Sequence, residues 1–232
     1  MSTYNTPGSP DLYDVADATM MLSQQEDVKI INISAGYIDA TSTSKEEQDA
    51  NGVYKFLYKT VYTPNLVESF RAVAQKGKVI VLASGNKGDN IFPPQFFHKS
   101  RESRAQIMGH LIEALDAETR ESVVLAGAFD RETNAHCGYS NKPGNWVEAQ
   151  ERFLFAPGRH ALSYDDWMVG GTSYAAPYIC AAIANLCSKP GVTPKMAVKA
   201  LMDSADERPE KAIYGRGVIR ADKALELLER GY

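Results

Sequence analysis

The sequence predicts a three-layer α/β/α fold with a mainly parallel sheet. Three apolar runs of strand length alternate with stretches in which apolar residues recur at helical spacing; the runs are VKIINISAG, KVIVLASGN and SVVLAGAFD. Runs that are apolar throughout are typical of strands covered on both faces. Strands that alternate with helices are expected to form a parallel sheet between two helical layers. Because no internal repeat or linker interrupts the 232 residues, one domain over 1–232 is predicted.

The first half of the chain is expected to contain two helices and two strands. Ser9-Pro10 is a typical helix start, with serine as the N-cap and proline at the first helical position. The strand Val28–Ser34 follows, and the polar stretch DATSTSKEEQDANG after it is expected to be an exposed loop. A second helix ends at Gly77, and the strand Lys78–Ser84 follows directly.

The second half repeats this alternation. A helical stretch that contains Leu111 precedes the third strand, Ser122–Ala128, and FLFAPG is expected to be a short strand or a sheet edge. A buried helix is predicted from Ala175 to Leu186. Thr193 is the expected cap of the next helix, and KALELLERG forms the last one.

Composition excludes several classes of partner. The formal net charge of −4 favours neither nucleic acid nor an anionic membrane. No apolar stretch is long enough to span a bilayer, and the start MSTYNTPGSPD is no signal peptide. Cys180 and Cys187 would lie about 10 Å apart on one helix, too far for a disulfide. Free thiols and the absence of a signal peptide favour a cytoplasmic location over a secreted one.

The stretch GGTSYAAPY, from Gly170 to Tyr178, raises the question of what Ser173 does. Two glycines allow a sharp bend and the close approach of another molecule. The apolar run that follows would place Ser173 at the positive end of a helix. Taken alone, the stretch fits a nucleophile or an ordinary helix cap.

Two strand ends are candidates for a site, because ligands of open α/β sheets gather at the carboxyl ends of the strands. These ends are Ser34-Ala35-Gly36 and Ser84-Gly85-Asn86. The Asn86 carboxamide could donate to a developing oxyanion. Asparagine beside glycine is equally typical of a simple turn.

Five motifs in this order resemble the subtilisin-like serine proteases over nearly the whole chain: INISAG, VLASGN, FAPG, GGTSYAAPY and YGRGVIRADKAL. The resemblance implies a serine endopeptidase that acts on peptides or proteins, with Ser173 as the nucleophile. It implies an oxyanion hole made by Asn86 and the backbone N–H of Ser173. Six further residues would bind substrate, the first three alongside its backbone and the others as a pocket wall: Ser34, Ala35, Gly36, Ala83, Ser84 and Gly85.

The chain departs from the family in its acid and base. The family carries aspartate in an Asp-Thr/Ser-Gly context and histidine before a glycine, both upstream of the serine. No aspartate here precedes Thr-Gly or Ser-Gly, and no histidine precedes glycine; the histidines are His98, His110, His136 and His160. We therefore expect that the N-terminal part of the fold is missing, that a separate segment supplies both groups, and that this chain alone is inactive.

Two other functions remain open. A degenerate protease could keep its cleft as a peptide-binding module. Gly171 to Ala175 nearly fits the Gly-x-Ser-x-Gly elbow of esterases, but that fold needs a histidine after the serine, and none follows His160. Family members often bind calcium, yet the sequence shows no cluster with the spacing of a known calcium loop. No cofactor or metal site is predicted.

Overall fold

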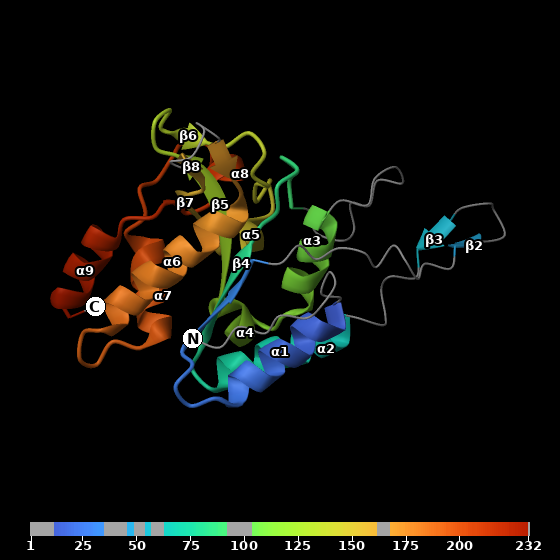
Figure 1. Ribbon diagram of the computed structural model, residues 1–232, viewed down its shortest axis with the longest axis horizontal. Coiled ribbons are helices and arrows are strands. Elements are labelled where there is room, and N and C mark those ends of the chain that lie inside the picture. Colours follow the sequence, from blue (N-terminus) through green and yellow to red (C-terminus); the bar gives the residue numbers. More distant parts are fainter. Residues whose placement is uncertain are drawn as a thin grey trace.

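A six-stranded sheet forms the centre of the computed structural model, which describes residues 12–34, 46–48, 54–56, 63–91, 104–161 and 168–231 (Figure 1). Five strands run parallel in the order β1-β4-β5-β7-β10, and β6 pairs antiparallel with β5. The strands are β1 (Ile30–Ile33), β4 (Val79–Ala83), β5 (Val123–Asp130), β6 (Ala135–His136), β7 (Phe153–Pro157) and β10 (Gly217–Val218).

The three predicted strands are confirmed as β1, β4 and β5, side by side. Ile30 lies opposite Val79, and Ile80 lies opposite Val123. Every residue of β4, β5 and β7 is buried, as expected for apolar runs covered on both faces. For β1 this expectation is wrong, because Asn32 is exposed and Ile30 only half-buried in this outermost strand of the described sheet. This register brings the carboxyl ends of β1 and β4 to the same edge of the sheet.

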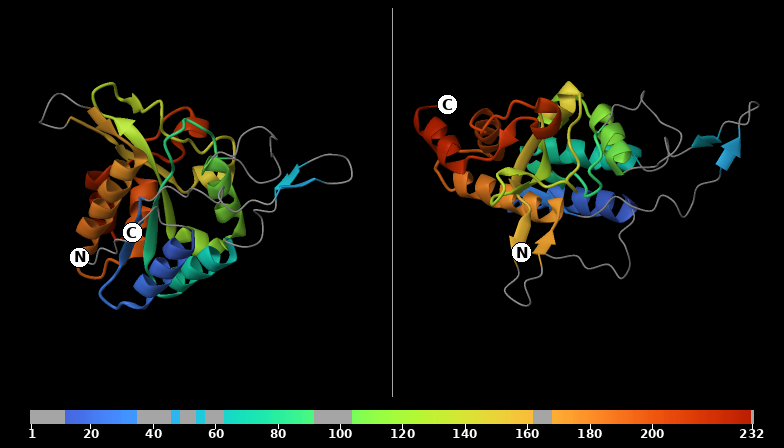
Figure 2. Two further views of the ribbon diagram at one scale, coloured as in Figure 1. Left: turned by 45° about the vertical axis from the view of Figure 1, so that its right-hand side comes forward. Right: turned by 90° about the horizontal axis from the view of Figure 1, so that it is seen from above.

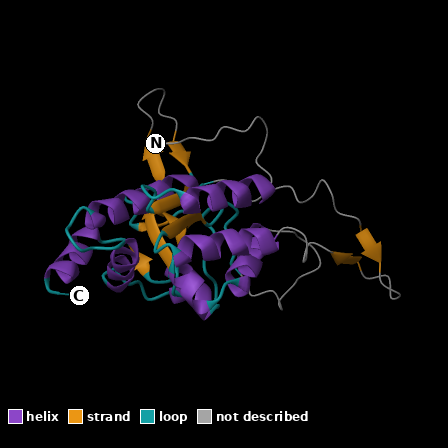
Figure 3. Ribbon diagram, turned by 90° about the horizontal axis from the view of Figure 1, so that it is seen from below, coloured by secondary structure: helices purple, strands orange, loops and turns teal. Residues whose placement is uncertain are grey.

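Helices cover both faces of the sheet, which confirms the three-layer architecture (Figures 2 and 3). Ile80 and Leu82 point into one core, while Val79 and Val81 point into the other. The first core is covered by α1 (Leu12–Gln24), α2 (Thr63–Gln75) and α3 (Arg104–Ala114). The second is covered by α6 (Thr172–Cys187), α7 (Pro194–Asp203) and α9 (Ala221–Glu229). The remaining described helices are short: α4 (Ala117–Glu121), α5 (Val147–Gln150) and α8 (Lys211–Tyr214).

Local signals in the sequence correctly marked helix ends. Thr193 caps α7, since its hydroxyl accepts a hydrogen bond from the Met196 N–H at 3.2 Å. Gly77 follows α2 in the left-handed region, at φ 68°. The buried helix predicted after Ser173 is α6, which packs on β1, β4, β5 and β7.

One expectation about the strands is wrong, and the structure decides between the two alternatives given for another. The stretch expected to be a loop contains β2 (Glu46–Gln48), which pairs antiparallel with β3 (Tyr54–Phe56). FLFAPG forms β7 as a strand, but β7 lies inside the sheet because β10 pairs with its outer side. β10 is too short to show any periodicity in the sequence. A further antiparallel pair, β8 (Arg159–Ala161) and β9 (Met168–Gly170), precedes α6.

Some predicted features lie outside the described residues: Ser9, Pro10, Ala35, Gly36 and His98. All three cysteines are free thiols, and only Cys137 is fully buried. Burial raises the pKa of Cys180 to about 12, so this thiol is un-ionised at neutral pH. Among the described helices, none has the length and apolar character needed to cross a bilayer.

Candidate active site

Three predicted site residues meet where β1 and β4 end and α6 begins. The Ser173 hydroxyl donates a hydrogen bond to the Ser34 carbonyl at 3.0 Å. Thr172, the residue before Ser173, binds the side chain of Asn86. The structure thus brings Ser34, Asn86 and Ser173 together at one edge of the sheet.

Ser173 lies in the first turn of α6, where backbone N–H groups have no acceptor within the helix. The N-cap is Gly171, which contributes no side-chain hydrogen bond. The positive end of the helix dipole is therefore available to an anion that develops beside Ser173.

Pro177 changes the hydrogen bonding of this turn. Proline has no N–H, so Pro177 cannot donate to the carbonyl of Ser173 four residues earlier. The Ser34 hydroxyl instead donates to that carbonyl at 3.2 Å, and Asn32 Nδ2 donates to the same hydroxyl oxygen at 3.0 Å. Ser34 and Ser173 are consequently linked by two reciprocal hydrogen bonds.

Thr172 orients the carboxamide of Asn86. Asn86 Oδ1 accepts hydrogen bonds from the Thr172 N–H at 2.8 Å and from the Thr172 hydroxyl at 3.0 Å. The same hydroxyl accepts from the Gly85 N–H at 3.1 Å. Asn86 is exposed, and its Nδ2 donates to no group in the described part of the chain. Because both hydrogen bonds of this carboxamide are accepted by Oδ1, Nδ2 stays available to donate to an incoming group.

A second buried side chain supports this loop. Asn141 is fully buried, and its carboxamide makes hydrogen bonds to three backbone groups of residues 84–89. Sequence reasoning missed both Thr172 and Asn141. For Thr172 a signal existed, because it is adjacent to Ser173; for Asn141, in YSNKP after the third strand, no local pattern was available.

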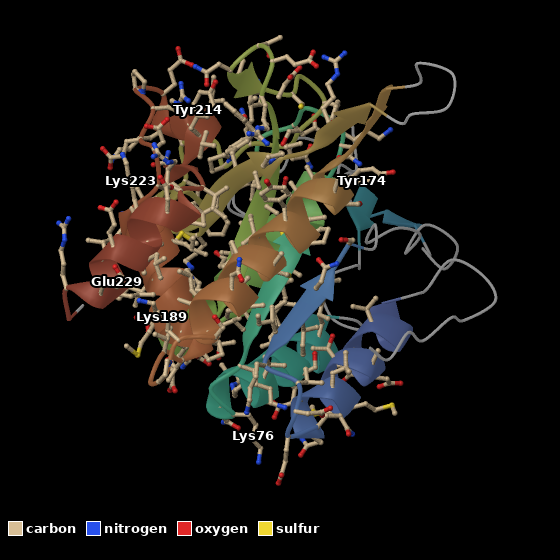
Figure 4. All side chains as sticks on the ribbon, turned by 60° about the vertical axis from the view of Figure 1, so that its left-hand side comes forward. Lys76, Tyr174, Lys189, Tyr214, Lys223 and Glu229 are labelled. Carbon is tan, nitrogen blue, oxygen red and sulfur yellow. The ribbon has the colours of Figure 1, made fainter. Side chains whose placement is uncertain are left out.

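Among the described side chains, none that could act as a general base accepts a hydrogen bond from the Ser173 hydroxyl. His136 lies on β6, where its ring packs edge-to-face against Tyr214 at 5.7 Å between centroids. Burial lowers the pKa of His136, and nearby Lys142 lowers it further. Figure 4 shows Tyr214 well apart from Tyr174, the neighbour of Ser173. The backbones of His110 and His160 belong to α3 and β8, and their side chains lie outside the described set.

The proposed pocket wall consists of the end of β4 and the turn after it. Ala83 and Ser84 are buried, at 6% and 2% exposure, so little of either residue is open to a substrate in this structure. Gly85 has a φ of +102°, which side-chain-bearing residues rarely adopt. The substrate-binding roles of Ser34, Ala83, Ser84 and Gly85 stay predictions.

Gly85→Ala should lower the free energy of unfolding by about 3 kcal/mol, from backbone strain plus a steric clash. A Cβ at this position would lie 2.6 Å from Asn141 Nδ2. Gly77→Ala is the matched control, since Gly77 also has a positive φ but a Cβ there would have no neighbouring atom within 4 Å. It should cost only about 1 kcal/mol. Urea unfolding measures the loss of stability in both variants. Equal losses would show that the contact between Gly85 and Asn141 is not tight.

No group of three or more His, Cys, Asp or Glu side chains suited to a metal ion occurs within the described ranges.

Comparisons with known proteins give the family and the fold. The sequence model of the subtilase family matches residues 2–217. The prenylagaramide maturation protease PagA aligns with 96% of this chain and 70% of its own, at 18% identity and a TM-score of 0.60. A lanthipeptide protease aligns over 94% and 66%, at 20% identity and a TM-score of 0.61.

The epidermin leader peptide processing protease EpiP from Staphylococcus aureus aligns over 94% of this chain and 54% of its own, at 19% identity and a TM-score of 0.62. The chain thus spans between 54% and 70% of the length of these three solved structures. No curated protein matches the chain. Since the family match extends over almost all of its length, the chain belongs to the subtilase family of serine proteases.

Proposed function

We propose that this chain supplies the nucleophile and the oxyanion donor of a serine endopeptidase. One observation carries the proposal: Ser173 begins α6, and Thr172 holds the Asn86 carboxamide beside it, with Nδ2 unpaired among the described residues. A module that only binds peptides has no need for a hydroxyl and an oriented donor in this arrangement.

The chemistry follows from these two groups. Ser173 Oγ would attack the carbonyl carbon of a peptide bond, and the carbonyl oxygen would become an oxyanion. Asn86 Nδ2 and the Ser173 N–H would donate to that oxygen, at the positive end of α6. Loss of the amine would leave an acyl-enzyme on Ser173, which water would then hydrolyse.

A base must take the proton of Ser173, since a serine hydroxyl is a weak nucleophile at neutral pH. In the described structure that proton is donated to the Ser34 carbonyl, which cannot serve as a base. We infer that a histidine and its partner aspartate come from a polypeptide segment other than these 232 residues. β1 is the outermost strand on its side of the described sheet, which leaves room for a further strand next to Ser34.

The substrate is proposed to be an extended peptide or protein segment. It would lie alongside Ser34–Gly36 as an added strand, with its side chain before the scissile bond against Ala83–Gly85. Among the solved structures that match, the PatG macrocyclase is described in complex with a peptide (TM-score 0.54, 18% identity).

Labelling with a fluorophosphonate probe tests the proposal, because the probe reacts only with an activated serine. The chain alone should remain unlabelled. Fusion to, or mixing with, the segment encoded immediately upstream should give labelling at Ser173, which peptide mass spectrometry locates.

Two controls interpret the labelling experiment. Ser173→Ala should abolish labelling, and so should alanine in place of the histidine of the added segment. If the upstream segment carries no His-Gly and Asp-x-Gly motifs, or if the combined protein stays unlabelled while still binding peptides, the protease proposal is wrong. The chain would then act as a peptide-binding module.

A further inference from the structure

The segment Tyr139–Lys142 packs directly beneath the loop that carries Asn86. Asn141 Nδ2 donates to the Ser84 carbonyl at 2.8 Å, while Oδ1 accepts from the N–H groups of Lys87 and Asp89, both at 3.1 Å. These bonds bracket Asn86 on both sides along the chain. Asn141 has no exposed surface, so bulk water does not compete for its hydrogen bonds.

Two glycines allow this close contact. The Asn141 N–H donates to the Gly85 carbonyl at 2.9 Å, and a Cβ on Gly85 would lie only 2.6 Å from Asn141 Nδ2. The Gly88 N–H donates to the Tyr139 carbonyl at 2.7 Å, with Gly88 at φ +70°. Residues 84–89 are thus held along their length by one neighbouring segment.

The same segment contacts the turn that precedes Ser173. The Tyr139 hydroxyl donates to the Gly158 carbonyl at 2.8 Å, and the Gly171 N–H donates to that carbonyl at 2.9 Å. Gly170 has no side chain where the Tyr139 hydroxyl lies; a Cβ there would be 2.6 Å away. Burial raises the pKa of Tyr139, so the hydroxyl keeps its proton for this bond.

We propose that Tyr139 and Asn141 are positioning residues that set the placement of Asn86 relative to Ser173. Asn141 acts on the backbone on either side of Asn86, and Tyr139 acts on the carbonyl shared with Gly171. Neither would touch the reacting atoms. The catalytic consequence rests on the proposed function, whereas the effect on the orientation of Asn86 does not.

The orientation of Asn86 is testable in the chain alone by NMR. In a sample with ¹⁵N-labelled asparagine, the Nδ2 resonances of Asn86 are identified by their loss in Asn86→Ala. We expect Asn141→Ala to displace or broaden them, because the backbone on both sides of Asn86 loses its hydrogen bonds. Tyr139→Phe, a milder change that keeps the ring, should displace them less.

Matched controls separate positioning from general stability. Thr193→Ala removes the α7 cap, and Tyr214→Phe removes a hydroxyl that accepts from the His136 N–H. Both should leave the Asn86 resonances in place. Unchanged resonances in both Asn141→Ala and Tyr139→Phe, with folded spectra, would overturn the proposal; so would equal displacement by the controls.

Kinetics of the combined, active protein test the catalytic consequence. Asn141→Ala should lower kcat about 10- to 100-fold with little change in KM, since only the placement of the oxyanion donor changes. In the Asn86→Ala background the same substitution should cost under about threefold, because neighbours that act through one group are not additive. Equal costs in both backgrounds would refute the positioning role.

The two proposals can fail separately. If the chain combined with the upstream segment is inactive while Asn141→Ala still displaces the Asn86 resonances, the proposed function is wrong and the orientation of Asn86 by Asn141 stands.

Discussion

The isolated chain should hydrolyse peptides about 10⁶-fold more slowly than the same chain combined with a segment that supplies histidine and aspartate. The magnitude is that known for loss of the histidine in subtilisin itself, a member of this family. The physical reason is the fate of the Ser173 proton, which the described structure directs to the Ser34 carbonyl rather than to a base. Without a base the hydroxyl stays a weak nucleophile, and only oxyanion stabilisation remains.

Turnover of a fluorogenic peptide library measures this difference. Ser173→Ala in the isolated chain sets the background, and the two should be nearly equal. Rapid turnover by the isolated chain that disappears in Ser173→Ala would contradict the requirement for an added base. In that event, substitution of His98, His110, His136 and His160 one at a time would identify the resident base.

Asn86→Ala should lower kcat of the combined protein about 100- to 1000-fold, with KM little changed. This range is again that of the corresponding asparagine in subtilisin. The donor would act on the oxyanion and not on the ground-state carbonyl, so its loss should affect the transition state alone. Thr172 gives the expectation its structural basis, because its two hydrogen bonds to Oδ1 turn Nδ2 outward.

Asn185→Ala is the matched control for this substitution, since Asn185 is an exposed asparagine of the same helix as Ser173. It should leave both kinetic constants unchanged. Steady-state kinetics with one peptide substrate compare the three proteins. A kcat for Asn86→Ala equal to that of the parent would remove Asn86 from the oxyanion hole.

Much of the fold was predictable because its signals are local. The continuous apolar runs of β4 and β5 indicate burial on both faces, and Thr193-Pro194 indicates the start of α7. β10 was not predictable, since two residues carry no period, and its pairing with β7 joins Gly217 to Leu154, far apart in the sequence. β2, which pairs antiparallel with β3, lies in a polar stretch where composition favours a loop.

The sequence by itself determined the family and indicated Ser34, Asn86 and Ser173 as candidate site residues, because their motifs are short, contiguous and in order. Only the tertiary structure decided which groups hold these residues in place. Ser34 and Ser173 are 139 residues apart, Thr172 and Gly85 are 87 apart, and Asn141 and Ser84 are 57 apart. A buried carboxamide satisfies its hydrogen bonds with whatever backbone the fold brings to it, and that choice is set by packing and not by neighbours in the chain. This is why Ser173 was identifiable as a candidate nucleophile from one short motif, whereas the hydrogen bonds of Thr172 and Asn141 to the loop of Asn86 are seen only in the tertiary structure.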